Sequence, residues 1–128
     1  MIAQITNGIK VSVQTEFQNE FSNAEESHFV FTYRILIENN SPNTIQVLRR
    51  QWFIHDLLEQ IREVNGDGIV GQQPVLEPGE SPAYVSGCNL RSGIGKMYGF
   101  YEMERVLNGA LFSVSIPEFV MVASWRLN

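Results

Sequence analysis

The residues most suggestive of chemistry are three glycines, Gly66, Gly68 and Gly71, which together have the G-x-G-x-x-G spacing. In dinucleotide-binding folds this spacing lets the backbone approach a pyrophosphate, which rests on the N-terminus of the following helix. No such helix is expected here, because Pro74 and Pro78 interrupt the segment that follows the motif. The motif therefore predicts either a plain glycine-rich turn between strands or a loop of amides that binds a small anion.

An amide loop of this kind needs a cation nearby, and the sequence offers Arg49, Arg50 and Arg91. Arg49 and Arg50 are adjacent, so on a strand their side chains point to opposite faces and a shared role is not expected. The simpler interpretation is a pair of exposed charges on a strand. The candidate anion site comprises Gly66, Gly68, Gly71, Arg49 and Arg50, with pyrophosphate or a nucleotide phosphate as its ligand.

The other reactive side chains lack the partners that catalysis requires. His28 and His55 do not have the close spacing of a zinc helix or a zinc finger. A catalytic thiol at Cys88 would need a base to generate the thiolate, and no G-x-S-x-G motif marks an activated serine. The sequence therefore predicts a protein that is not an enzyme, with no catalytic residues and no cofactor.

Two further groups of side chains have both a structural and a functional interpretation. The first group consists of four carboxylates, which form either a solvated acidic rim or a weak site for a hard cation: Asp56, Glu59, Glu63 and Asp67. None of them is assigned as a metal ligand. Five aromatic residues form either part of the core or a recognition surface: Trp52, Phe53, Tyr98, Phe100 and Tyr101.

Composition limits the remaining possibilities. The chain has 128 residues, 44% of them hydrophobic and 18% charged, which fits one globular domain spanning residues 1–128. The net charge of −5 disfavours generic nucleic-acid binding. The single cysteine excludes an internal disulfide and suits a reducing compartment. No signal peptide or membrane span is apparent, so a cytoplasmic location without membrane insertion is expected.

Strands account for most of the hydrophobic pattern. In residues 28–39 the side chains follow a period-two pattern, with Phe29, Phe31, Tyr33, Ile35 and Ile37 on one side, and this pattern predicts a strand. A turn at residues 39–43 then leads to a second strand over 44–55, and the two are expected to form a hairpin. Along the second strand the apolar positions change from odd to even, which indicates a bulge or burial of both faces.

Shorter segments continue this pattern along the chain. Further strands are expected near residues 9–13, 61–65, 81–88, 96–104, 112–116 and 119–125, with a surface loop over 17–27. Several short strands separated by turns, without a long amphipathic helix, predict an all-β sandwich or barrel of about seven or eight strands.

The whole chain from Ile9 to Phe119 resembles the ApaG family, whose domain also occurs in certain F-box proteins and in a polymerase-interacting protein. The resemblance rests on an ordered series of motifs, of which no single one is specific. These are Phe-Thr-Tyr at 31–33, Ile-Glu-Asn-Asn at 37–40, Val-Leu-Arg-Arg-Gln-Trp at 47–52, Gly-Asp-Gly-Ile-Val-Gly-Gln-Gln-Pro at 66–74, Leu-Glu-Pro-Gly-Glu at 76–80, Tyr-Val-Ser-Gly at 84–87, Gly-Lys-Met-Tyr-Gly at 95–99 and Ile-Pro-Glu-Phe at 116–119. Gln51 departs from the family, in which histidine is common before the tryptophan.

The resemblance implies a fibronectin type III-like or immunoglobulin-like β-sandwich. It also implies a link to cobalt and magnesium resistance or efflux and a pyrophosphate or nucleotide site at the glycine motif. With no catalytic constellation visible, we expect a binding or regulatory module that acts through protein partners of unknown identity. Small-anion binding by the glycine motif is the alternative, and a homodimer formed through an outer strand stays open.

Overall fold

The structure is a computed structural model that describes residues 1–123. Within this range it contains nine strands and one short 3-10 helix, η1 (Asn19–Phe21), and no helix long and apolar enough to cross a membrane. The strands are β1 (Ile2–Thr6), β2 (Ile9–Phe17), β3 (Phe29–Asn39), β4 (Ile45–Asp56), β5 (Arg62–Asp67), β6 (Val75–Leu76), β7 (Ala83–Leu90), β8 (Ile94–Arg105) and β9 (Leu111–Val122).

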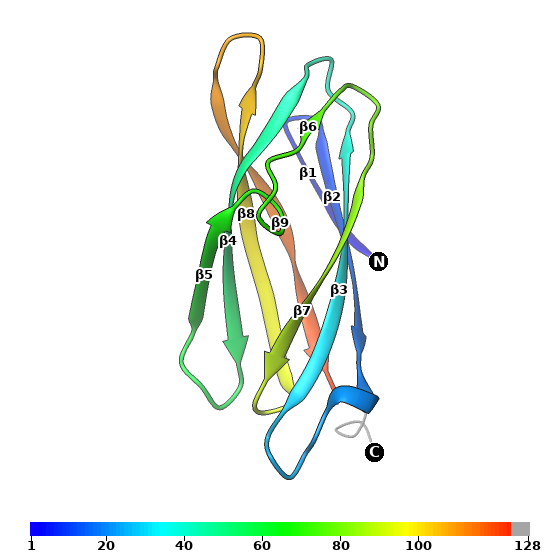
Figure 1. Cartoon of the computed structure of the whole chain (residues 1–128), viewed down its shortest axis with the longest axis vertical. Coiled ribbons are helices and arrows are strands. Elements are labelled where there is room, and N and C mark those ends of the chain that lie inside the picture. The colour runs from blue at the N-terminus through cyan, green and yellow to red at the C-terminus, as the bar shows by residue number, and fades with distance from the viewer. Residues whose placement is uncertain (124–128) are drawn as a thin grey trace.

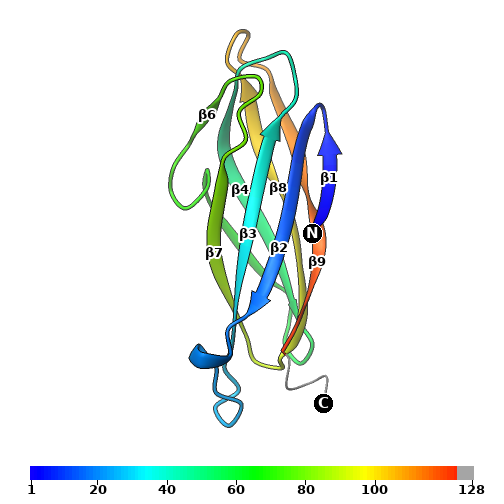
Figure 2. The ribbon, with the colours of Figure 1, turned by 90° about the vertical axis from the view of Figure 1, so that its right-hand side faces the viewer.

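These strands form two antiparallel sheets that pack face to face (Figure 1). One sheet has the order β1-β2-β3-β7, and the other has the order β5-β4-β8-β9, with β6 also pairing with β4. Figure 2 views the first sheet from its outer side, with β4, β8 and β9 behind it. The expected all-β sandwich is confirmed, with nine strands among the described residues instead of seven or eight.

Alternation along the strands produces the core. In β3 every second residue is buried: Phe29, Phe31, Tyr33, Ile35 and Ile37. The intervening side chains are half-buried or exposed on the outer face. This confirms the strand expected over residues 28–39, because period-two hydrophobicity places one face of a strand on the opposing sheet.

The expected irregularity in β4 is a bulge. The pairing of β4 with β8 shifts register between Val47 and Arg49, so that Leu48 is the extra residue. Val47 before the bulge and Trp52 after it both lie in the core. The bulge therefore restores the inward direction of the apolar side chains after their parity changes.

The hairpin expected between residues 28–39 and 44–55 is wrong. β3 pairs with β2 and β7, whereas β4 pairs with β5, β6 and β8 in the other sheet. The side-chain amide of Asn39 donates to the carbonyl oxygens of Asn43 at 2.9 Å and Leu76 at 3.0 Å, which holds the chain in a corner between the sheets. Turn residues favour a reversal in either case, so their types do not distinguish a hairpin from such a corner.

The two strands expected near 112–116 and 119–125 are one strand, β9. Pro117 lies inside it and is buried, opposite the place where the register with β8 shifts between Met97 and Gly99. An irregularity of this kind tolerates the proline, which has no N–H to donate to the ladder. The expected strand also included Trp125, which lies outside the described residues. β1 and β6 were not expected at all.

The two long sides of the sandwich differ. On one side β1 and β2 pack against β9, and the backbone N–H of Ser115 donates to Thr6 Oγ1 at 3.3 Å. On the other side the end strands are β5 in one sheet and β7 in the other (Figure 1). Val64 of β5 is 38% exposed, whereas Trp52, which is directly paired with it on β4, is 4% exposed. The sandwich is therefore open along β5 and β7.

Candidate functional site

The glycine motif lies on the open side of the sandwich. β5 ends at Asp67, the chain leaves the edge of β4 as the loop 68–74, and β6 returns to the same edge at Ile45 and Gln46. Within the loop Ile69 is only 4% exposed and belongs to the core. The loop thus anchors itself by one buried side chain and covers part of the open side.

The tip of the loop is a tight two-residue turn. Ile69 and Gln72 exchange backbone hydrogen bonds of 2.7 and 3.0 Å, and between them Val70 has φ 50° and Gly71 has φ 79°. Positive φ at both central residues is the signature of a type I′ turn. Val70 is 63% exposed, and a β-branched residue is strained in this conformation.

Several amides of the motif are already engaged. Gly68 N–H donates to Leu48 O at 2.8 Å, and the amides of Ile69 and Gln72 are used by the turn. A Cβ on Gly68 would collide with the backbone oxygen of Gln72, so only glycine fits there. The packing of the turn therefore accounts for glycine at position 68. The same contacts leave fewer backbone N–H groups available to an anion than a loop with unpaired amides would offer.

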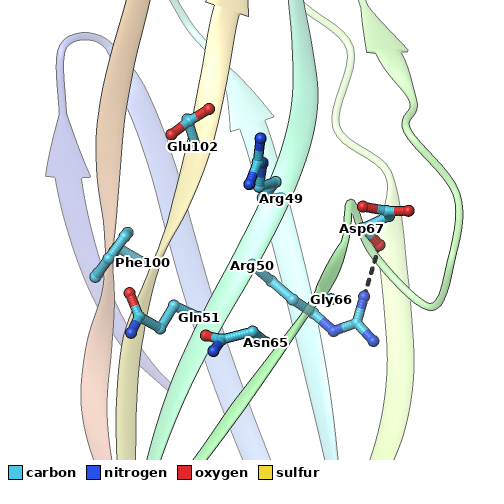
Figure 3. A pocket seen from close by; sticks show the side chains of 8 residues that line it. All are labelled: Arg49, Arg50, Gln51, Asn65, Gly66, Asp67, Phe100 and Glu102. Carbon is cyan, nitrogen blue, oxygen red and sulfur yellow. Dashed lines mark hydrogen bonds between the residues drawn. The ribbon is translucent and has the colours of Figure 1, made fainter.

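Arg50 lies over Gly66. The two residues are paired between β4 and β5, and a Cβ on Gly66 would meet the guanidinium carbon at 2.7 Å. Arg50 Nη1 donates to the carbonyl oxygens of Asp67 at 2.6 Å and Gly68 at 3.4 Å (Figure 3). Glycine at position 66 therefore makes room for the guanidinium, which is held by main-chain carbonyls and not by a carboxylate.

Arg49 has a different environment. It is paired with Asp67 on β5 and with Glu102 on β8, so carboxylates flank it on both sides. Figure 3 shows its side chain directed away from that of Arg50, although both arginines line one hollow of about 480 Å³ together with Gly66 and Phe100. The structure thus holds Arg50 against Gly66 and Gly68, and it places Arg49 in the same hollow as Gly66 with its side chain directed elsewhere.

A groove runs between β5 and β7 below the glycine loop, and we call it the edge groove. Its volume is about 320 Å³, its floor contains Tyr33, Trp52 and Met97, and its walls are Arg62 and Val64 of β5 and residues 86–89 of β7. Arg50 closes one end and also borders a smaller hollow beneath Val70. Arg62 Nη2 reaches across the groove to Asn89 O at 3.0 Å.

The floor of the edge groove is aromatic. Tyr33, Trp52 and Phe119 pack together with ring centroids 5.4 to 6.0 Å apart. Burial raises the pKa of the Tyr33 hydroxyl, against the smaller lowering effects of a hydrogen bond with Ser86 and the charge of Arg50. Burial also raises the pKa of the Cys88 thiol, which outweighs the nearby charge of Arg62. Cys88 is therefore a protonated thiol at neutral pH, without the thiolate that nucleophilic catalysis needs.

The other candidate side chains have structural surroundings. His55 Nε2 lies 3.1 Å from Tyr98 Oη on the outer face of the second sheet, where Phe53 stacks on Tyr98. Asp56 is 6% exposed and accepts hydrogen bonds from the backbone N–H groups of Arg91 and Ser92 and from Ser92 Oγ. It is thus a buried acceptor and not part of an acidic rim. Residues 1–123 contain no cluster of three or more His, Cys, Asp or Glu side chains suited to a metal ion.

Sequence reasoning did not single out Arg62 or the exposed edge of β7. The available signal was the alternation Arg62, Val64, Gly66, which places all three on the same side of a strand. Without the sheet order, nothing indicated that this side lacks a covering strand.

Comparisons with known proteins agree with one another. The ApaG domain profile matches residues 19–105. The chain is 45% identical to Protein ApaG of Brucella anthropi and 42% identical to Protein ApaG of Paramagnetospirillum magneticum, each over 119 residues, covering 93% of this chain and 91% of the relative. A solved structure described as an ApaA protein of Bordetella pertussis is 41% identical, has a TM-score of 0.86, and matches over 90% of this chain and 93% of its own length.

Proposed function

The chain belongs to the ApaG family, and from this premise we propose that it is a binding module which recognises protein partners through the edge groove and carries out no catalysis. The observation that supports this proposal is the open side of the sandwich. There an aromatic floor, an exposed edge strand and two arginines meet in one groove. Grooves that combine apolar surface with a few fixed polar groups are the usual form of recognition sites.

Binding of pyrophosphate or a nucleotide phosphate by the glycine motif is the second candidate function. Arg50 favours it, since its guanidinium carries a positive charge beside Gly66 and Gly68. The engagement of the Gly68 and Ile69 amides by carbonyl oxygens weighs against it. We therefore rank it below partner recognition.

A role in cobalt or magnesium resistance fits the same proposal if the module acts on another protein. The carboxylate of Asp56 is engaged by Arg91 and Ser92, and Glu59 pairs with Arg91 at 3.4 Å. Direct metal binding by these carboxylates would have to displace existing contacts. Titration with paramagnetic Co²⁺ tests this, because localised broadening of the NMR signals of Asp56 or Asp67 would indicate direct binding.

The proposal is tested by capturing partners from a bacterial lysate on three immobilised proteins: the unchanged chain, Arg62→Glu in the edge groove, and Arg34→Glu on the outer face of β3. Arg34 is exposed, so its variant has the same change in charge away from the groove. We expect a partner that the unchanged chain and the Arg34 variant retain and the Arg62 variant loses. Retention equal in all three, or no greater than on an unrelated β-sandwich, would refute recognition through this groove.

A further inference from the structure

We propose that the edge groove receives an extended acidic segment of a partner protein, which pairs with β7 as a fifth strand of the β1-β2-β3-β7 sheet. This inference rests on the function proposed above and specifies the partner segment. Its carboxylates would bind Arg50 and Arg62, the latter in exchange for its bond to Asn89 O, and its backbone would bind the outward edge of β7. Strand addition of this kind supplies affinity through main-chain hydrogen bonds and specificity through alternate side chains.

The first support is the orientation of the β7 backbone. Ile37 N–H donates to Pro82 O at 3.0 Å, which fixes the hydrogen-bonded pairs between β3 and β7 at every second residue. Tyr84, Ser86 and Cys88 therefore direct their backbone groups to β3, whereas Val85, Gly87 and Asn89 direct theirs outward. The bond from Arg62 to Asn89 O agrees with this orientation.

The second support is the space beside β7. In the described part of the chain β7 pairs with β3 alone, and β5 is the end strand of the opposite sheet on the same side. The core-facing side of β5 is consequently uncovered, as the 38% exposure of Val64 shows. A strand added to β7 would cover Val64 and complete the sandwich.

The third support is charge. Two arginines and no carboxylate are found among the described residues that line the edge groove and the hollow beneath Val70. Neither Arg50 nor Arg62 forms an ion pair within residues 1–123, and the hydrogen bonds of their guanidinium groups go to main-chain oxygens and the Cys88 sulfur. In a chain of net charge −5, this groove is a local positive site complementary to carboxylates.

The register of β4 and β5 sets the sequence pattern of the partner. Arg62 is paired with Ile54, Val64 with Trp52, and Gly66 with Arg50, so the two arginines are separated by four residue steps along β4. At about 3.4 Å per residue this is about 14 Å. The complementary segment therefore has two acidic residues four positions apart with an apolar residue midway, as in Glu-x-Val-x-Glu.

The probe is the blocked peptide acetyl-Thr-Glu-Thr-Val-Thr-Glu-Thr-amide, titrated to millimolar concentration into the isotopically labelled protein and followed by NMR. We expect saturable shifts of the Val85, Gly87 and Asn89 amides and of the Arg50 and Arg62 side-chain N–H signals. A peptide with both glutamates replaced by lysine should bind at least tenfold more weakly. A peptide with N-methyl groups on its backbone should no longer shift the β7 amides, and this control requires no change to the protein.

Two variants give the matched test in the protein. Val85→Pro removes an outward backbone N–H that pairs with no strand of the described chain, and Arg62→Gln removes one positive charge. Each substitution should weaken binding of the glutamate peptide at least tenfold. Arg34→Gln should leave binding unchanged. Absence of shifts along β7, or equal binding of the lysine peptide, overturns the inference, as does a response to pyrophosphate but not to the peptide. A captured partner that is lost with Arg62→Glu but kept with Val85→Pro would refute strand addition while preserving recognition through the groove.

Discussion

The guanidinium of Arg50 occupies the space that a side chain at Gly66 would fill. The first residue of the glycine motif is therefore coupled to an arginine sixteen positions earlier, and the coupling is steric before it is electrostatic. Because the guanidinium ends a flexible side chain, it can be displaced without movement of the backbone.

Gly66→Ala should displace Arg50 from Asp67 O at little cost in stability. The new Cβ would approach Arg50 Nη2 to 2.6 Å, so the side chain must move, while the loss of chain entropy in the unfolded state partly offsets the lost contact. We expect a change within about 1 kcal/mol in urea unfolding, together with a clear shift of the Arg50 Nε–H signal. An unchanged Arg50 signal would contradict the coupling.

Gly68→Ala should be far more damaging than Gly66→Ala. The added Cβ would meet the backbone oxygen of Gln72, and φ at position 68 is 48°, so the turn itself must rearrange. A loss of about 2 to 4 kcal/mol in unfolding free energy is expected, since backbone strain and lost hydrogen bonds act together. Urea denaturation of the two variants side by side checks this order, and equal losses would show that the turn adapts.

Val70→Asn should stabilise the chain. Val70 is exposed and has φ 50°, where asparagine is tolerated and valine is strained. The expected gain is about 0.5 to 1 kcal/mol, measured by thermal or urea unfolding. Val75→Asn, at another exposed valine with no positive φ, serves as the control and should not stabilise.

Asp56→Ala should destabilise the chain by about 2 to 4 kcal/mol, because it removes the buried carboxylate that accepts from the backbone N–H groups of Arg91 and Ser92 and from the Ser92 hydroxyl. The control is Glu59→Gln, which removes only an exposed ion pair with Arg91 and should change stability by less than about 1 kcal/mol. Similar effects of both substitutions in urea unfolding would contradict the structural role of Asp56.

Stability should fall as pH rises above about 9. Burial raises the pKa values of Cys88, Tyr33 and Tyr101 above the ordinary values of 9.0 for the thiol and 10.0 for the phenols, so the unfolded state loses these protons first. Below their ordinary pKa values these groups make their full contribution to the free energy of unfolding. As pH rises from the ordinary toward the folded-state pKa values, each group loses up to about 1.4 kcal/mol of that contribution per pH unit. Urea unfolding at pH 8 and 10.5 measures it, and Tyr33→Phe should reduce the slope. Equal stability at both values would contradict burial of these groups.

Local patterns predicted the strands well and their partners less well. The alternation of β3 and the parity change of β4 depend on which side chains face the core, and both were visible in the sequence. β3 and β4 belong to different sheets, and the bonds from Asn39 to Asn43 and Leu76 hold the corner between them. Leu76 lies far along the chain, so no local pattern could reveal that contact. The strands expected near 112–116 and 119–125 likewise belong to one strand, in which Pro117 lies opposite the irregularity of β8.

The candidate site was predicted in part. The glycine motif and Arg50 were identified from residue types, and the structure brings them together, but Arg49 lies between Asp67 and Glu102. Arg62 and the β7 edge were missed because their importance comes from an uncovered strand. Such an absence is a property of the sheet order and has no sequence signature.

The asymmetry between the two long sides of the sandwich also bears on how the molecule opens. Ser115 and Thr6 tie the sheets together along one side, and Asp56 joins the end of β4 to the turn before β8. Along the other side, the side-chain hydrogen bonds between β5 and β7 within residues 1–123 come from Arg62 alone. We therefore expect the lowest-energy local opening to widen the edge groove, so that amide hydrogen exchange along β7 would slow markedly once a partner strand is bound.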